Sequence, residues 1–337
     1  MKALHRVLIN KETSFNPIWI MRQAGRYLPE FRKIRSENQD FIKLCLNSEL
    51  SSKITLQPIQ RFNLDSAIIF SDILMVPYAL GQKVKFVKDK GPILSDFNFE
   101  SFLNNDEKSF SNKLSPIYKS IEITRKRLDE KKSLIAFVGA PWTLLIYMLG
   151  IKKENSKINL NKIINSKFRI NNILEHLIKF LCIHIKNQIK AGADVIQIFD
   201  SWAGLIPEGK IKNYCLLPNA KIVNFCNTTK IPNICFPKGI KENYENFNNF
   251  VKPNGINIDP DVDPFWAREK LKNVVIQGGL DPNVLLKSEE EMILAATKYI
   301  QAFKDFPYIF NLGHGLLPET DPDKLDRLIK FYRNYDG

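Results

Sequence analysis

Short apolar runs, separated by longer stretches with helical spacing, set the organisation of this chain. Eight runs of mostly β-branched or apolar residues each end in a polar residue or a glycine, a pattern typical of buried β-strands. The runs are residues 17–21, 67–70, 134–138, 195–199, 231–236, 255–258, 274–276 and 308–311. Stretches with helical periodicity separate most of them, so strands and helices alternate along the chain.

Three of the helical stretches have clear patterns. In residues 172–190 the apolar side chains recur at three- and four-residue steps, which places them on one face of a helix. Residues 289–303 follow a capping box. Residues 321–332 begin with a cap residue followed by a proline, which is typical of a helix start.

The repeated alternation predicts an α/β fold, a (β/α)₈ TIM barrel forming a single domain over residues 1–337. The alternative is a doubly wound open sheet, but that fold normally has a glycine-rich phosphate loop after its first strand, and no such loop occurs.

Two long connections interrupt the pattern. Residues 82–87 and the turn at 91–92 predict a hairpin that covers the barrel mouth, and residues 150–166 predict an exposed loop.

In a barrel of this kind, the residues that follow the carboxyl ends of the strands gather at one face, where active sites lie. The sequence places cations, carboxylates, a hydroxyl and a histidine at these positions. The residues are Arg22, Arg26, Asp72, the turn 139–142, Asp200, Ser201, Asp259, Gly278, Gly279 and, between two glycines, His314. This mixed ring predicts a binding mouth.

The first of these positions has the most distinctive pattern. Arg22 and Arg26 bracket three residues directly after an apolar run, and Gly25 between them lets the backbone bend so that both guanidiniums aim into one cavity. Two planar cations in one pocket suit a ligand with several carboxylates or phosphates. The alternative is a surface loop with two solvated arginines.

Composition adds few constraints. The chain has 337 residues, of which 44% are apolar and 25% charged, which is ordinary for a globular protein. No apolar run is long enough for a membrane span, and the start lacks a signal-peptide pattern, so we expect a cytoplasmic protein. The net charge of +13 would suit binding to nucleic acid, a membrane surface or an acidic small molecule. The lysines are scattered along the chain, however, so the charge is weak evidence for any of these functions.

Metal-binding patterns are weak. The five cysteines form no CxxC pair, so neither a disulfide framework nor a zinc cluster is expected. His176 and His184 lie eight residues apart in a predicted helix. A metal site there stays open, although two separate helix residues are the commoner arrangement.

Six segments, in their order along the chain, resemble the uroporphyrinogen decarboxylases of haem and chlorophyll biosynthesis. The segments are residues 21–32, 70–74, 137–147, 199–204, 277–282 and 310–320. The resemblance covers nearly the whole chain and implies a (β/α)₈ barrel, usually a homodimer whose two clefts face each other. It also implies an enzyme without a cofactor that converts the four acetate arms of uroporphyrinogen III to methyls, giving coproporphyrinogen III.

By position, the resemblance implies substrate contacts at Arg22, Gln23, Ala24, Gly25, Arg26, Asp72, Tyr147, Ser201 and His314. Arginines would pair with the substrate carboxylates, while the catalytic Asp72 would accept pyrrole N–H groups and stabilise the cationic intermediate. Taken alone, Asp72 fits a helix cap equally well, Tyr147 a core-rim position and Ser201 a turn cap. Arg22 is also placed for catalysis, but the proton donor stays open because a guanidinium has a pKa above ~12.

The chain departs from the family pattern at Ala136, where glycine is usual, and at Gly150, where glutamate is frequent. Residues 259–261 replace an Asp-Trp-Thr pattern in the expected cleft wall.

The nearest rival function is that of a zinc-dependent methyltransferase on the same barrel, but such an enzyme needs a cysteine two residues after His314, where this chain has Leu316. A non-catalytic binder of polyanions such as RNA is a second rival, and no interleaved aromatic and basic motif supports it.

Overall fold

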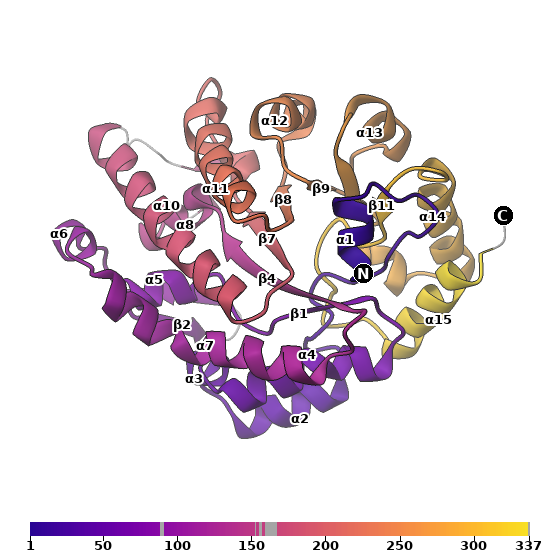
Figure 1. Cartoon of the computed structure of the whole chain (residues 1–337), viewed down its shortest axis with the longest axis horizontal. Helices are drawn as coiled ribbons and strands as arrows, with labels where there is room; N and C mark the ends of the chain where they lie inside the picture. Colours follow the sequence, from indigo (N-terminus) through magenta and orange to yellow (C-terminus); the bar gives the residue numbers. More distant parts are fainter. Residues whose placement is uncertain (88–90, 152, 155–156, 159–166, 336–337) are drawn as a thin grey trace.

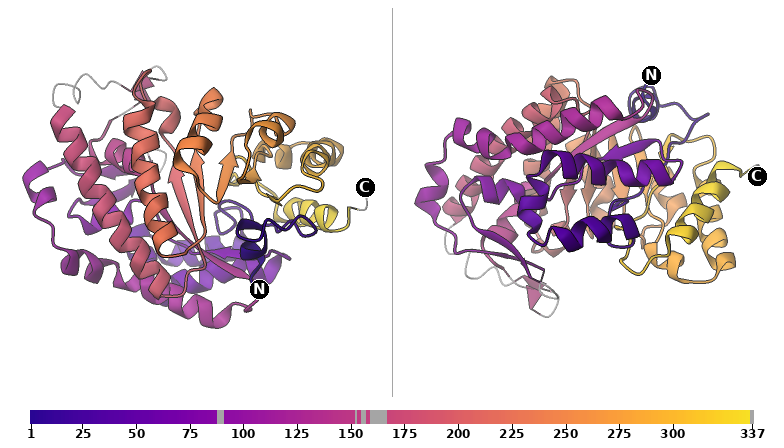
Figure 2. Two further views of the ribbon diagram at one scale, coloured as in Figure 1. Left: turned by 45° about the horizontal axis from the view of Figure 1, so that its top comes forward. Right: turned by 90° about the horizontal axis from the view of Figure 1, so that it is seen from below.

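In the computed structural model, the described residues are 1–337 without 88–90, 152, 155–156, 159–166 and 336–337. A curled sheet of seven parallel strands lies at the centre, with helices on its outer side (Figures 1 and 2). The strands are β1 (Ser66–Ile68), β4 (Ser133–Gly139), β7 (Val195–Asp200), β8 (Asn233–Pro237), β9 (Gly255–Ile258), β10 (Val275–Gly278) and β11 (Tyr308–Ile309). They follow one another across the sheet in chain order, without the reversal that defines a doubly wound sheet, so that alternative is wrong.

The first predicted strand, residues 17–21, joins the sheet only in part, whereas the other seven runs are confirmed as strands. Ile18 forms an isolated parallel bridge with Phe310, just after β11. On the other side, the Asp65 amide, just before β1, donates to the Ile18 carbonyl oxygen at 2.9 Å. The segment therefore runs between the two edge strands of the sheet.

Three of the four amides in this segment donate to side-chain acceptors, whereas the Trp19 amide donates to the Phe310 carbonyl oxygen at 3.3 Å. The acceptors are Asp65 Oδ2 for the Ile18 amide (2.7 Å), Gln23 Oε1 for the Ile20 amide (3.1 Å) and Asn311 Oδ1 for the Met21 amide (2.8 Å). Apolar spacing indicates that a segment is extended and buried, but it does not show which groups will accept hydrogen bonds from its backbone amides. The prediction of a full strand here is wrong for that reason.

The helices form the outer layer, and the three predicted from clear patterns are confirmed as α10 (Lys167–Lys190), α14 (Glu289–Ala302, with its capping box) and α15 (Pro322–Arg333). The other α-helices are α1 (Ala3–Leu8), α2 (Pro29–Glu37), α3 (Phe41–Cys45), α4 (Ser48–Arg61), α5 (Met75–Ala79), α6 (Phe99–Leu103), α7 (Glu107–Arg127), α8 (Pro141–Met148), α11 (Leu217–Thr228), α12 (Tyr244–Val251) and α13 (Pro264–Lys270). Short 3₁₀ or π turns are η1 (Ala203–Leu205), η2 (Lys212–Leu216), η3 (Lys241–Asn243) and η4 (Pro282–Leu286). Within the described residues, no helix is long and apolar enough to cross a membrane.

Helix α1 covers the amino ends of the strands. Leu4 and Leu8 are fully buried in one apolar cluster with strand residues such as Ile135 and Ile309. The Leu4 amide donates to Oγ of Ser133, the first residue of β4, at 3.0 Å. Because α1 closes this end, a ligand has to approach the sheet from the carboxyl ends of the strands.

The long connections contain two antiparallel hairpins. Strands β2 (Val84–Val87) and β3 (Gly91–Leu94) pair as predicted, while the position of this hairpin over the mouth stays a prediction. Strands β5 (Lys153–Glu154) and β6 (Lys157–Ile158) pair within the stretch predicted to be a loop, so that prediction is wrong for these residues. The other residues of the predicted loop after Ile151 lie outside the described part of the chain.

Candidate active site

Arg22 stands at the turn that ends the extended segment, and its side chain is exposed. Its backbone has a φ of +63°, a left-handed conformation that few residues other than glycine adopt. The Gln23 amide donates back to the Ile20 carbonyl oxygen at 2.9 Å, which closes the turn. Gly25 does not have a positive φ, so our prediction that it makes the bend is wrong and Arg22 itself makes it.

Asp72 follows β1 and lies within the electrostatic reach of Arg22. Its Oδ1 accepts the Leu74 amide at 2.8 Å and so stabilises the turn before α5, but Leu74 is the N-cap of that helix, so the interpretation of Asp72 as a helix cap is wrong. Burial raises the pKa of Asp72 to about 6, although the Leu74 amide and the Arg22 charge both lower it. Neither Arg22 nor Asp72 has an ion-pair partner within 4.0 Å among the described residues, so both charges remain available to a ligand.

Tyr147, on α8, belongs to the same group. Its half-buried ring packs edge-on against Trp202, with 5.7 Å between the ring centroids. Burial raises the pKa of the Tyr147 hydroxyl, the Asp72 charge raises it further, and the Arg22 charge lowers it. Tyr147 therefore packs like a core-rim residue while its hydroxyl lies within electrostatic reach of both charged groups.

His314 lies on the loop after β11 and is half-buried. Burial lowers the pKa of His314, and the positive charges of Lys238 and Arg22 lower it further. Its Nδ1 donates to the Gly315 carbonyl oxygen at 3.4 Å. The imidazole is therefore neutral at neutral pH, and a negative charge brought to it would favour its protonated form.

The sequence analysis missed Lys238, which directly follows β8. The charge of Lys238 lowers the pKa of both His314 and Asp259, so it lies among the mouth residues. The sequence analysis selected a residue after most of the predicted runs, but none directly after the fifth run, residues 231–236. The signal was present: Ile234 and Phe236 pack in the cluster that contains α1, and the two-residue period of a strand continues to Lys238.

Of the residues Gln23, Ala24 and Gly25, it is Gln23 that holds the turn in place. Gln23 is fully buried, and its Nε2 donates to the Ser66 carbonyl oxygen of β1 at 3.1 Å. Its carbonyl oxygen accepts the Tyr27 hydroxyl at 2.7 Å. These bonds fix the segment to the sheet, and contacts of these three residues with a substrate stay predictions.

Arg26 and Ser201 are exposed. Among the described residues, neither side chain forms a hydrogen bond or an ion pair. Ser201 directly follows β7, as predicted, and the next residue, Trp202, packs against Tyr147. The structure therefore leaves their predicted roles in substrate binding untested.

Two predicted mouth carboxylates are buried in the protein. Asp200, which is 1% exposed, accepts Thr143 Oγ1 at 2.7 Å and Asn219 Nδ2 at 2.9 Å, and burial raises its pKa to about 6. Asp259 accepts the Gly239 amide at 2.6 Å and the Tyr244 hydroxyl at 2.7 Å. Asp200 therefore holds helices α8 and α11, and Asp259 holds the loop at Gly239 and helix α12.

The departures at positions 136 and 150 have local structural consequences. Ala136 is fully buried in β4, where it pairs with Ile196 of β7. Gly150 has a φ of +61° just beyond α8, and its amide donates to the Tyr147 carbonyl oxygen at 3.1 Å. A glycine suits this left-handed position better than a glutamate would.

The possible metal pair is explained by packing. His184 is buried, contacts the Tyr118 hydroxyl at 3.0 Å and Gln188 Nε2 at 3.1 Å, and its pKa falls to about 3. His176 packs against the rings of Phe102 and Phe180. Within the described ranges, no three His, Cys, Asp or Glu residues lie close enough to hold a metal ion.

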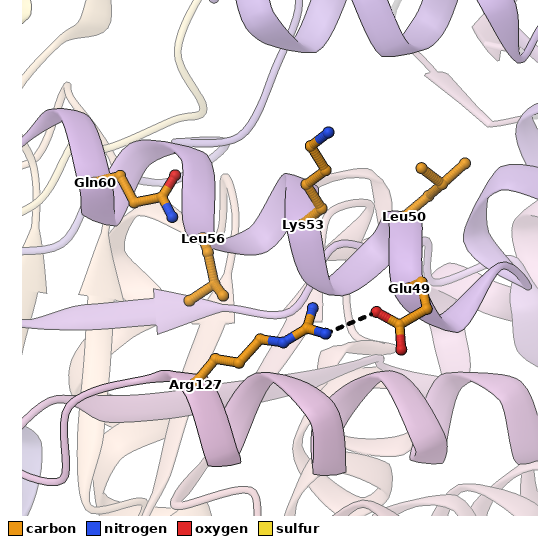
Figure 3. A pocket seen from close by; sticks show the side chains of 6 residues that line it. All are labelled: Glu49, Leu50, Lys53, Leu56, Gln60 and Arg127. Carbon is orange, nitrogen blue, oxygen red and sulfur yellow. Dashed lines mark hydrogen bonds and ion pairs between the residues drawn. The ribbon is translucent and has the colours of Figure 1, made fainter.

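A surface hollow lies elsewhere, between α4 and α7 in the outer helix layer (Figure 3). Its lining residues are Glu49, Leu50, Lys53, Leu56, Gln60 and Arg127. Arg127 Nη2 pairs with Glu49 Oε2 at 2.9 Å across it. None of the predicted site residues lines this hollow.

Comparisons with known proteins agree on one family. A family model described as "Uroporphyrinogen decarboxylase (URO-D)" matches residues 1–335. The uroporphyrinogen decarboxylase of Rickettsia bellii is 39% identical over 327 residues and 95% of each chain, and that of Orientia tsutsugamushi strain Boryong is 38% identical over 341 residues and 99% of each. A solved methyltransferase from Methanosarcina mazei shares the fold, with a TM-score of 0.80, 14% identity and 98% coverage of both chains.

Proposed function

The chain belongs to the uroporphyrinogen decarboxylase family, and from this premise we propose how its residues carry out the reaction. It is an enzyme that decarboxylates uroporphyrinogen in tetrapyrrole biosynthesis. In our proposal the substrate is uroporphyrinogen III, each of its four acetate arms becomes a methyl group, and the product is coproporphyrinogen III.

The observation that carries the proposal is a cation and a carboxylate at the carboxyl ends of the strands, close enough to influence each other yet without ion-pair partners among the described residues. Burying a substrate carboxylate without a partner costs several kcal/mol. A cation at ~4 Å returns about 4 kcal/mol at an effective dielectric near 20. Arg22 and Arg26 fill this role, and Lys238 supports them from β8.

Asp72 stabilises the positive charge that the reaction creates. A proton added to a pyrrole carbon makes the ring an electron acceptor; the bond to the carboxylate carbon then breaks, its electron pair moves into the ring, and CO₂ leaves. Protonation of the exocyclic carbon and loss of the ring proton complete the methyl group, so each cycle consumes one proton. The Asp72 carboxylate accepts the pyrrole N–H groups and is in place before the cation forms.

Tyr147, Ser201 and His314 bind acetate or propionate oxygens in this proposal. His314 accepts a proton when a substrate carboxylate offsets the positive charges that lower its pKa. The backbone of Gln23, Ala24 and Gly25 lies against the same ring.

The extended segment at residues 17–21 completes a closed (β/α)₈ barrel as its eighth member, supported by the Ile18–Phe310 bridge and the Asp65 hydrogen bond. The single-domain organisation, the homodimer, the cytoplasmic location and the lack of a cofactor or nucleic-acid partner stay predictions.

The decisive experiment is anaerobic incubation with uroporphyrinogen III, followed by separation of the products by carboxyl number. We expect conversion from the octacarboxylic substrate to a tetracarboxylic product, unchanged by a metal chelator. A product that keeps all of its carboxyl groups, or activity that a chelator abolishes, would contradict the proposal.

A further inference from the structure

The loop of residues 311–316 holds the turn at Arg22 from both sides. Asn311 is fully buried, and its Oδ1 accepts the Met21 amide at 2.8 Å. At the other end of the loop, the Leu316 amide donates to the Met21 carbonyl oxygen at 2.9 Å. Both backbone polar groups of the residue before Arg22 are therefore bound by one loop, although 290 residues separate Met21 from Asn311.

Gly315, in the same loop, lies directly beneath the Arg22 side chain. A Cβ atom at position 315 would lie 2.3 Å from Arg22 Cδ, 2.6 Å from Cγ and 2.8 Å from Nε. These distances are far below van der Waals contact, so the stem of Arg22 occupies the space that any other residue at position 315 would fill. The path of the Arg22 side chain depends on a glycine at this position.

We propose that Asn311 and Gly315 are positioning residues that fix the Arg22 guanidinium relative to His314 and Asp72, so that these groups contact one substrate molecule together. The inference rests on the role of Arg22 in the proposed function. The backbone of Arg22 supports it, because a left-handed φ of +63° costs a non-glycine residue about 1–2 kcal/mol, which local hydrogen bonds have to offset. The hydrogen bonds to Met21 are among them.

The other glycine beside His314 provides a matched contrast. A Cβ atom at Gly313 would lie 2.7 Å from both Cδ and the backbone nitrogen of Pro260. A proline ring cannot rotate away, whereas the exposed Arg22 side chain can. Alanine at position 315 should therefore displace Arg22 and leave the fold intact, while alanine at position 313 should destabilise the fold.

The test is a double-mutant cycle on kcat/KM for uroporphyrinogen III with Gly315→Ala, Arg22→Ala and the combined variant. We expect Gly315→Ala to lower kcat/KM about 100-fold, because a displacement of about 1 Å costs that much, while Tm stays at the wild-type value. In the Arg22→Ala background the same change should cost less than about threefold, since no atoms beyond Cβ remain to be displaced. Gly313→Ala should lower Tm.

Three results would overturn the inference. If the fold-losses of kcat/KM from the two single variants multiplied in the combined variant, Gly315 would act independently of Arg22. If Gly315→Ala kept the wild-type kcat/KM while Arg22→Ala lowered it, only the positioning role of Gly315 would be refuted. Wild-type kcat/KM for Arg22→Ala would also remove the role of Arg22 in the proposed function.

Asn311 is tested by two nearly isosteric variants. Asn311→Asp keeps an oxygen for the Met21 amide, and the Asn311 Nδ2 that it removes has no hydrogen-bond partner in the described structure. Asn311→Leu removes the acceptor of both the Met21 amide and the neighbouring Leu312 amide, which lies 2.7 Å from Asn311 Oδ1. We expect the leucine variant to lose about 100-fold in kcat/KM and the aspartate variant to retain most of it. Equal losses in the two variants would contradict a role for the hydrogen bond.

Discussion

The two ends of β7 carry an aspartate each and use it in opposite ways. Asp194, just before the strand, pairs with Lys2 and with Arg125 Nη1, the latter at 2.8 Å. Asp200, the last residue of the strand, is bound by the uncharged donors of Thr143 and Asn219. An ion-paired carboxylate and one held by neutral groups therefore stand six positions apart, one just before the strand and one at its end.

This difference extends beyond β7. At the amino end, beneath α1, charges neutralise one another within the protein. At the carboxyl end, Arg22 and Asp72 influence each other across a distance but form no ion pair within the described structure. If the carboxyl end binds the anionic substrate, as we propose, this asymmetry is required, since internally paired charges would not be free to bind the ligand.

The largest expected effect is at the carboxyl end. Asp72→Ala should lower kcat about 100- to 1,000-fold, because it removes the preorganised charge that stabilises the cationic intermediate. The melting temperature should not fall, because removal of the buried carboxylate offsets the lost acceptor of the Leu74 amide. Steady-state kinetics and thermal melting check this, and turnover at the wild-type rate would refute the role of Asp72.

The comparison itself is tested by two matched substitutions on β7. Asp194→Asn should reduce the free energy of unfolding by about 3 kcal/mol, because it removes the negative charge that pairs with Lys2 and Arg125 and leaves Arg125 only its bonds to backbone carbonyl oxygens. Asp200→Asn should change it by less than about 1 kcal/mol, since an amide keeps an acceptor for Thr143 and burial already disfavours the charge. Urea unfolding at pH 7 measures both, and equal losses would contradict the asymmetry.

Asp72→Asn should stabilise the protein at neutral pH. Burial raises the pKa of Asp72 to about 6 from 3.8, so between these values the folded chain holds a proton that the unfolded chain releases. Asp72 therefore costs stability increasingly as pH rises from about 4 to about 6, and the variant should gain about 3 kcal/mol at pH 7. Unfolding at pH 7 and pH 3.5 checks the sign, and an equal gain at both would contradict the assignment.

Arg26→Ala should have the smallest effect. Loss of one exposed cation at the mouth should raise KM about tenfold, equivalent to about 1.4 kcal/mol, with stability within about 0.5 kcal/mol of the wild type. Arg127→Ala, another exposed arginine that lies in the outer helix layer, is the control and should leave KM unchanged. If the two variants gave the same KM, Arg26 would have no role in substrate binding.

The sequence predicted the sheet well because its strands are buried and rich in β-branched residues. It could not predict the local form of residues 17–21, since the amide acceptors there come from distant side chains such as Asn311. The left-handed turn at Arg22 has the same origin. Lys238 could have been predicted, because the two-residue period of β8 continues to it, but no residue directly after the run 231–236 was considered as a site residue.

The contact between Pro260 and Gly313 has a consequence for how this sequence can drift. The backbone nitrogen of Pro260, and not only its ring, would lie 2.7 Å from a Cβ atom at position 313, so replacing the proline alone makes no room for a side chain there. A combinatorial library covering both sites should therefore recover glycine at 313 whether or not the chain keeps its proline at 260.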